Sequence, residues 1–125
     1  MNGGHAISLG NAWEAEPGDD GHATEWVRRF GRPTGLEPGD SLWLVIDEPA
    51  ACTLVLNGTR LPESGPGAAY RVEITPLVRD RNLLVLVPHG RVAVGGPVAS
   101  RVPLPTPLGR VRLEIVPAGP ARPAG

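Results

Sequence analysis

The sequence predicts an all-β domain, a sandwich of mostly antiparallel strands with a single short helical turn. The stretch SLWLVIDEPAACTLVLNG, residues 41–58, contains two apolar runs with the period of two that is typical of β-strands. The chain also has 17 Gly and 15 Pro, and nearly all of them separate short apolar runs, as turns do. No segment predicts a helix longer than about a turn or two. At 125 residues the chain has the length of one domain.

The first part of the chain predicts two strands and two loops. Residues 6–9 alternate and predict an edge strand, and the polar segment that follows, which contains Trp13 and ends at Gly21, predicts a long loop. Residues 24–30, TEWVRRF, predict a strand on which two aromatic rings and a guanidinium share one face. These side chains belong to Trp26, Arg28 and Phe30. Residues 33–40, PTGLEPGD, predict a loop.

The central stretch, residues 41–58, predicts an inner hairpin of the sandwich. Asp47-Glu48-Pro49 interrupts the pattern between the two arms, since Pro has no N–H to give to the ladder. Asn57-Gly58 supplies the positive φ angles that a tight second turn requires. The inward-facing residues of the two arms, which we expect in the core, are Leu42, Leu44, Leu54 and Leu56.

The second half of the chain predicts three further strands. After a brief return at 59–61 and a loop, residues 70–74 predict a strand with an apolar inner side. Thr75-Pro76 predicts a helix N-cap followed by Pro at the first helical position. NLLVLV, residues 82–87, predicts a central strand covered on both faces, and residues 110–116 alternate clearly. Between these two, residues 88–109 predict a long loop with at most a short strand near 99–104.

Composition and charge limit the partners and the compartment. Residues 1–80 hold twelve acids and six Arg, and residues 81–125 hold six Arg and one Glu, so a net charge of −1 divides into −6 and +5. No run of Lys or Arg exists, so nucleic acid is not an expected partner. The lone Cys52 lies in an apolar run and predicts a buried thiol. Without a signal-like segment or an apolar run of ~20 residues, we expect a cytoplasmic protein without a membrane partner.

Five segments occur in a specific order: EWVRRF, LEPGDSLWLVID, ACTLVLNG, YRVEITPLV and NLLVLV. Together they resemble the N-terminal sugar-binding domain of family-2 glycoside hydrolases, a jelly-roll within the galactose-binding-domain-like fold, over residues 24–116. Glu73 replaces the Asp that usually precedes Ile74-Thr75, and LGRVRL, residues 108–113, is similar to the closing strand of that family. The resemblance implies a jelly-roll β-sandwich at 1–116, and residues 117–125 predict a disordered Pro/Gly/Ala tail.

The resemblance implies no catalysis, because the acid and the nucleophile of the full enzymes lie in a separate barrel domain. The residues agree, since a glycosidase needs two carboxylates on opposite sides of the scissile bond and the acids of the first loop crowd together. These acids are Glu14, Glu16, Asp19 and Asp20. Ser64 has no G-x-S-x-G motif around it, and a Ca²⁺ at Asp19-Asp20-Gly21 would need further oxygen ligands. The histidines His5, His22 and His89 have no metal-ligand spacing. We expect no catalytic residue, metal or cofactor.

Sugar binding requires an exposed aromatic ring beside planar hydrogen-bonding groups. Four of the five aromatic residues, Trp26, Phe30, Trp43 and Tyr70, lie in predicted strands, where we expect core packing. Trp13 lies in the polar loop and is predicted to be exposed, with Arg28 or Arg71 as nearby donors, although packing as a lid over the sheet edge is the alternative.

Two functions follow from these observations. The first is a non-catalytic carbohydrate-binding or accessory module, which rests on the family resemblance. The second is a protein-interaction or structural β-sandwich with no sugar ligand, which the uneven charge and the scarcity of exposed aromatic residues favour.

Overall fold

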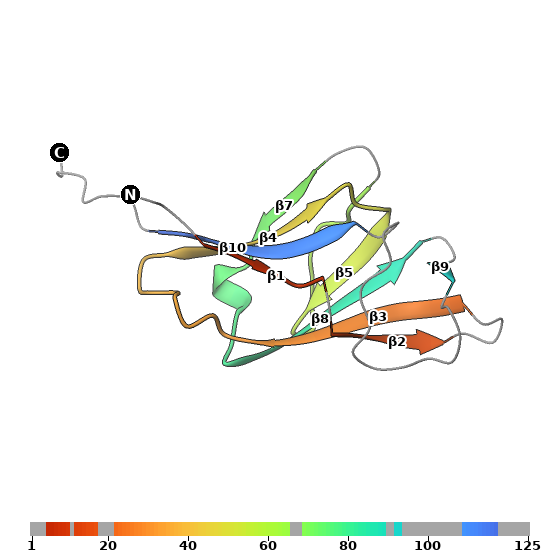
Figure 1. Ribbon diagram of the computed structural model, residues 1–125, viewed down its shortest axis with the longest axis horizontal. Helices are drawn as coiled ribbons and strands as arrows, with labels where there is room; N and C mark the ends of the chain where they lie inside the picture. The colour runs from red at the N-terminus through yellow and green to blue at the C-terminus, as the bar shows by residue number, and fades with distance from the viewer. Residues whose placement is uncertain are drawn as a thin grey trace.

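Two antiparallel β-sheets pack face to face in the computed structural model of the chain (Figure 1). The structure describes residues 5–10, 12–17, 22–65, 69–89, 92–93 and 109–117. The four-stranded sheet has the order β1 (His5–Ser8), β10 (Arg110–Val116), β4 (Ser41–Asp47) and β7 (Tyr70–Glu73). The six-stranded sheet has the order β2 (Trp13–Pro17), β3 (His22–Gly31), β8 (Arg81–Pro88), β5 (Cys52–Leu56) and β6 (Thr59–Arg60), with β9 (Val92–Ala93) beside β3. This arrangement confirms the predicted all-β sandwich.

The core lies between the two sheets and takes its side chains from both. The four leucines that the alternation places inward are all at most 1% exposed, so the predicted register of both runs is confirmed. Apolar burial on this scale is the main force that holds two sheets together. The largest fully buried side chains are those of Leu9, Trp13, Leu42, Leu44, Ile46, Leu54, Leu56, Ile74, Leu84, Leu86 and Leu113.

The stretch 41–58 is not the hairpin that the sequence predicts, because its two arms lie in different sheets. β4 pairs with β10 and β7, whereas β5 pairs with β8 and β6. The segment between the arms crosses from one sheet to the other at Glu48, whose φ is 51°, and at the buried Pro49. Inward leucines on both arms suit either arrangement, and here they face one another across the core.

Gly109 shows how tightly this crossing is packed. It precedes β10 with a φ of 95°, and a Cβ atom at this position would lie 2.7 Å from the carbonyl oxygen of Asp47 and 2.8 Å from Cγ2 of Ile46. Only glycine fits such a backbone conformation at so short a separation. The start of β10 is therefore fixed against the corner where the chain leaves β4.

The tight turn after β5 is confirmed, since Asn57 and Gly58 have φ angles of 52° and 84° and join β5 to β6. The helical turn is η1 (Thr75–Leu77), a single 3-10 turn. Its N-cap is Ile74, so the prediction of Thr75 as the cap is wrong. The Thr75 hydroxyl instead accepts a hydrogen bond from the backbone N–H of Leu42, at 2.8 Å, and so attaches the turn to β4.

Two further predictions need correction. The segment that begins at Trp13 is strand β2 rather than loop, because Trp13 and Ala15 are buried while Glu14 points outward, which is enough apolar alternation for an edge strand. β8 is central but not covered on both faces among the described residues, since Leu83 is 37% exposed and Val85 is half-buried. The strand expected near 99–104, the acids Asp19 and Asp20 and residues 118–125 of the tail lie outside the described residues.

Within the described ranges, no helix is long and apolar enough to cross a membrane.

Candidate functional site

Trp13 does not present its ring to solvent. The side chain is 0% exposed, and its Nε1 donates a hydrogen bond of 2.5 Å to the carbonyl oxygen of Leu9. The predicted exposure is wrong because β2 pairs with β3 and turns Trp13 toward the opposite sheet. Trp13 is therefore a core residue at the edge of the six-stranded sheet, as the alternative for this residue anticipated.

The three residues predicted to bind a ligand do not form one site. Arg28 lies directly opposite Trp13 in the pairing of β2 with β3, where it is half-buried and donates to the carbonyl oxygen of Arg29. Arg71 lies on β7 in the other sheet, exposed, with its guanidinium carbon 4.1 Å from the centre of the Trp43 ring. Trp43 was predicted to be a core residue, but it is half-buried on the outer face of β4.

An open groove of about 650 Å³ lies where β3 ends and β8 begins. The pairing of these strands sets Phe30 opposite Asn82 and Gly31 opposite Arg81, so side chains distant in sequence meet there. Its size falls within the range of small-molecule sites in proteins, about 300–1,000 Å³. The lining residues are Arg29, Phe30, Gly31, Asn57, Asp80, Arg81, Asn82 and Leu83.

Two asparagines make the floor of the groove rigid. Oδ1 of Asn82, which is 3% exposed, accepts hydrogen bonds from Nδ2 of Asn57 at 2.9 Å and from the backbone N–H of Arg79 at 2.8 Å. Its Nδ2 donates to the carbonyl oxygens of Phe30 and Arg79, so both donors and both acceptors of this amide are used. Asn57 also accepts from the N–H of Leu83 at 2.9 Å. The floor joins β3, β8 and the turn after β5.

The side chains along the walls of the groove differ from the asparagines of the floor, because several of them are exposed and can reach a ligand. Arg81 and Asp80 are exposed, and neither forms an ion pair within the described part of the chain. Arg29 is paired with Glu14 at 2.9 Å. Phe30 is partly buried against the core, and Leu83 supplies apolar surface. The groove therefore combines an aromatic ring, an aliphatic wall, a carboxylate and two guanidinium groups.

Sequence reasoning missed this groove because no local pattern marks it. Its residues come from three separate stretches of the sequence, and each stretch by itself predicts only the end of a strand or a turn. The one available signal is the pair Asp80-Arg81, two charges placed directly before the most apolar run of the chain.

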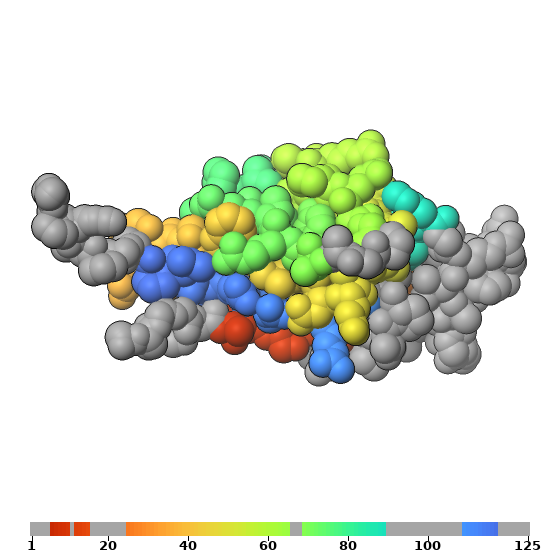
Figure 2. All heavy atoms as spheres, turned by 90° about the horizontal axis from the view of Figure 1, so that it is seen from above, coloured from red at the N-terminus to blue at the C-terminus, as the bar shows by residue number. Residues whose placement is uncertain are grey.

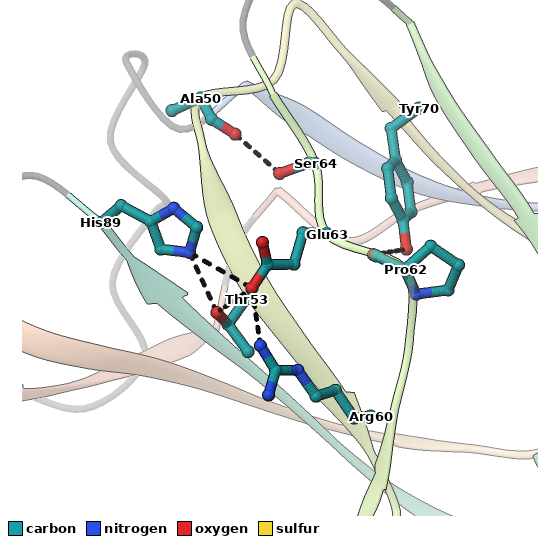
Figure 3. Close-up of polar contacts among 8 residues, drawn as sticks. All are labelled: Ala50, Thr53, Arg60, Pro62, Glu63, Ser64, Tyr70 and His89. Atoms are coloured by element: carbon teal, nitrogen blue, oxygen red, sulfur yellow. Dashed lines mark hydrogen bonds and ion pairs between the residues drawn. The ribbon is translucent and has the colours of Figure 1, made fainter.

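A second polar cluster surrounds His89 at the end of β8 (Figure 3). Nε2 of His89 lies 2.9 Å from the Thr53 hydroxyl and 3.8 Å from Oε2 of Glu63, and Arg60 donates to the same carboxylate oxygen at 2.7 Å. A catalytic relay needs the nucleophile and the acid on different ring nitrogens of the histidine. Here both approach Nε2, so the arrangement fastens the segment after β6 to β5 and β8.

The remaining candidates are structural within the described residues. Ser64 is 5% exposed, and its hydroxyl donates to the carbonyl oxygen of Ala50 at 2.6 Å (Figure 3). Burial raises the pKa of the Cys52 thiol, as expected of an inert buried cysteine, and raises the pKa of Tyr70 to about 12. No group of three His, Cys, Asp or Glu side chains within these residues is arranged to hold a metal ion.

Stability should depend on pH through Glu63. Hydrogen bonds from Arg60 and Thr53 hold the pKa of Glu63 below the ordinary value of a glutamate. The contribution of this carboxylate to stability is therefore fully present above that ordinary value and is lost as the pH falls through the lowered pKa. We expect Glu63→Gln to lower the melting temperature by about a degree or two at pH 7, and we expect this difference to shrink as the pH falls through the lowered pKa of Glu63. Thermal melts of both proteins across this pH range measure the difference. Glu37 is exposed, so the control variant Glu37→Gln should leave the melting temperature at pH 7 unchanged. A difference between Glu63→Gln and the wild type that does not shrink as the pH falls would contradict the assignment.

No protein-family model matches the sequence, and no curated protein matches it. Solved structures do match. An FMN-binding β-glucuronidase from Facaelibacterium prausnitzii L2-6 has a TM-score of 0.62 and 20% identity over 91% of this chain and 23% of its own. The β-glucuronidase of Bifidobacterium dentium, in complex with coumarin-3-O-glucuronide, has a TM-score of 0.63 and 14% identity over 94% of this chain and 31% of its own.

A β-glucuronidase from an uncultured Clostridium sp. has a TM-score of 0.60 and 12% identity over 94% of this chain and 30% of its own. The TM-scores of these three structures show a shared fold, so the resemblance to family-2 glycoside hydrolases is confirmed at the level of architecture. The chain spans 23–31% of the length of these structures.

Proposed function

We propose that this chain is a non-catalytic carbohydrate-binding domain and that its sugar lies in the groove between the end of β3 and the start of β8. The observation that carries the proposal is the combination of residues there. The ring of Phe30, the exposed carboxylate of Asp80 and the exposed guanidinium of Arg81 line the same groove, with the hydrogen-bonded amides of Asn57 and Asn82 as its floor.

Each of these groups suits one part of a sugar. The C–H face of a pyranose ring is apolar and packs against aromatic and aliphatic side chains, here Phe30 and Leu83. Sugar hydroxyls are both donors and acceptors, so an acid and an arginine side by side can bind neighbouring hydroxyls, each through a charge-assisted hydrogen bond. Because Asn57 and Asn82 are already satisfied, the floor keeps its shape while the exposed groups bind, which lowers the entropic cost of association.

The comparisons support a sugar as the ligand class, since the matching structures are β-glucuronidases and one holds a glucuronide. The groove itself supports a binding role without hydrolysis. Asp80 is the one carboxylate among its described lining residues, whereas a glycosidase places two carboxylates around the scissile bond.

Arg81→Ala should weaken sugar binding about ten- to hundredfold, because it removes a charge-assisted hydrogen bond that is worth about 1.5–3 kcal/mol. Isothermal titration with a panel of mono- and oligosaccharides measures this loss. Calorimetry is preferred to fluorescence, since the described residues that line the groove include no tryptophan.

Arg110→Ala is the matched control, because Arg110 is an exposed arginine on the other sheet, and it should leave affinity unchanged. Equal loss in both variants would point to non-specific electrostatics. No response of the wild-type domain to any neutral or acidic sugar would overturn the proposal.

A further inference from the structure

The outer face of the four-stranded sheet carries one aromatic ring between two acids. Figure 2 looks onto this sheet, in which β10 (blue), β4 (orange to yellow) and β7 (green) lie side by side. The pairing sets Trp43 directly opposite Glu114 on one side and Glu73 on the other. A row of Glu, Trp and Glu therefore crosses three strands on a half-buried to exposed surface.

The guanidinium of an arginine in the same chain already lies over the Trp43 ring. The guanidinium carbon of Arg71 lies 4.1 Å from the ring centre of Trp43, and its Nη2 lies 3.7 Å from Oε1 of Glu114. An aromatic face next to carboxylates attracts a cation, and Arg71 shows that a guanidinium fits in this place.

Arg71 is held loosely, so another guanidinium can replace it. Its side chain is 47% exposed, and its ion pair with Glu114 is longer than a hydrogen bond. Oε2 of Glu114 is engaged by Arg112, at 2.9 Å, which leaves Oε1 as the oxygen that faces Arg71. On the far side of the ring, Oε2 of Glu73 accepts from Thr75 at 2.8 Å, while its Oε1 accepts no hydrogen bond from the described residues.

We propose that Trp43, Glu73 and Glu114 form a docking site for an arginine side chain of a partner protein, and that Arg71 is an internal occupant which the partner displaces. A planar guanidinium can stack on the indole and hydrogen-bond to the carboxylates beside it, whereas an ammonium group has no face to stack. The ring is half-buried on the outer face of the sheet, between strands β10 and β7, which suits a side chain delivered by a larger protein surface. Trp and Arg are also the residues in which the binding energy of protein interfaces is concentrated.

The test follows the indole N–H signal of Trp43 by NMR while the wild-type domain is titrated with the peptide acetyl-Gly-Arg-Gly-amide. We expect a saturable shift, and we expect Arg71→Ala to bind the peptide about two- to fivefold more tightly, because an exposed cation–π contact no longer competes. The matched peptide with Lys in place of Arg should bind more weakly to both proteins.

Trp43→Leu should abolish binding, as followed through the backbone amides of β4 and β7. Glu73→Gln, which leaves the ring in place, should weaken binding and keeps the proposal testable if the first variant does not fold. The proposal would be overturned if Arg71→Ala bound the Arg peptide no more tightly than the wild type does, or if the Lys peptide bound as tightly as the Arg peptide. Arg81→Ala in the groove should leave peptide binding unchanged, so this site and the sugar site can fail independently.

Discussion

Leu54→Asp is expected to leave the chain unfolded at room temperature. Leu54 is 0% exposed in the middle of β5, opposite Leu86 of β8, and faces the other sheet across the core. The substitution removes the packing of a buried leucine, which alone costs about 2–5 kcal/mol, and places a carboxyl group where no partner compensates it. The total, about 5 kcal/mol or more, is comparable to the stability of an ordinary domain.

Circular dichroism and urea denaturation measure this effect, and Leu83→Asp is the matched control. Leu83 belongs to the same sheet but is 37% exposed on its outer face, so its carboxylate would remain in water. We expect the control to unfold cooperatively with little loss of stability. A cooperatively folded Leu54→Asp protein would show that the register of β5 is wrong.

Trp13→Ala is expected to lower the free energy of unfolding by about 3–5 kcal/mol, the cost of emptying a fully buried aromatic site. The side chain is 0% exposed, and its indole N–H holds the carbonyl oxygen of Leu9 at 2.5 Å. The loss includes this hydrogen bond, whose acceptor would be left without its partner.

Urea denaturation followed by circular dichroism tests the value, and Trp43→Ala serves as the comparison. Trp43 is half-buried on an outer face, so its removal leaves no enclosed cavity and should cost far less. If Trp13→Ala does not fold, Trp13→Phe fills most of the site and should give an intermediate loss. A larger cost for Trp43 than for Trp13 would contradict the placement of these two rings.

The two tryptophans also show where sequence reasoning fails. Trp13 stands among acidic and small residues, a pattern that predicts a loop. In the structure the segment is the edge strand β2, and the inward side chains of Trp13 and Ala15 alone are enough to bury one of its faces. Trp43 stands in an apolar run and reads as core, yet its position alternates with the inward Leu42 and Leu44 and so faces outward. The polarity of the neighbouring residues therefore led to a wrong prediction for both tryptophans. The alternation of side chains along β4, in contrast, places Trp43 on the face opposite Leu42 and Leu44.

The candidate groove illustrates a second limit. Phe30, Asn57 and Asn82 belong to different strands or turns, and only the pairing of β3 with β8 and the turn after β5 bring them together. A single sequence records the pattern of each strand but not which strands are neighbours.

The sequence alone determined that the chain forms short strands with alternating faces, where the tight turn at Asn57-Gly58 lies, and which leucines face the core. These features follow from local stereochemistry and from burial with a period of two. Tertiary structure alone decided that the two runs in 41–58 belong to opposite sheets, that Trp13 is covered, and that the groove exists. The physical reason is that an inward-facing strand gains nearly the same burial in either sheet, so the choice depends on how all strands pack at once.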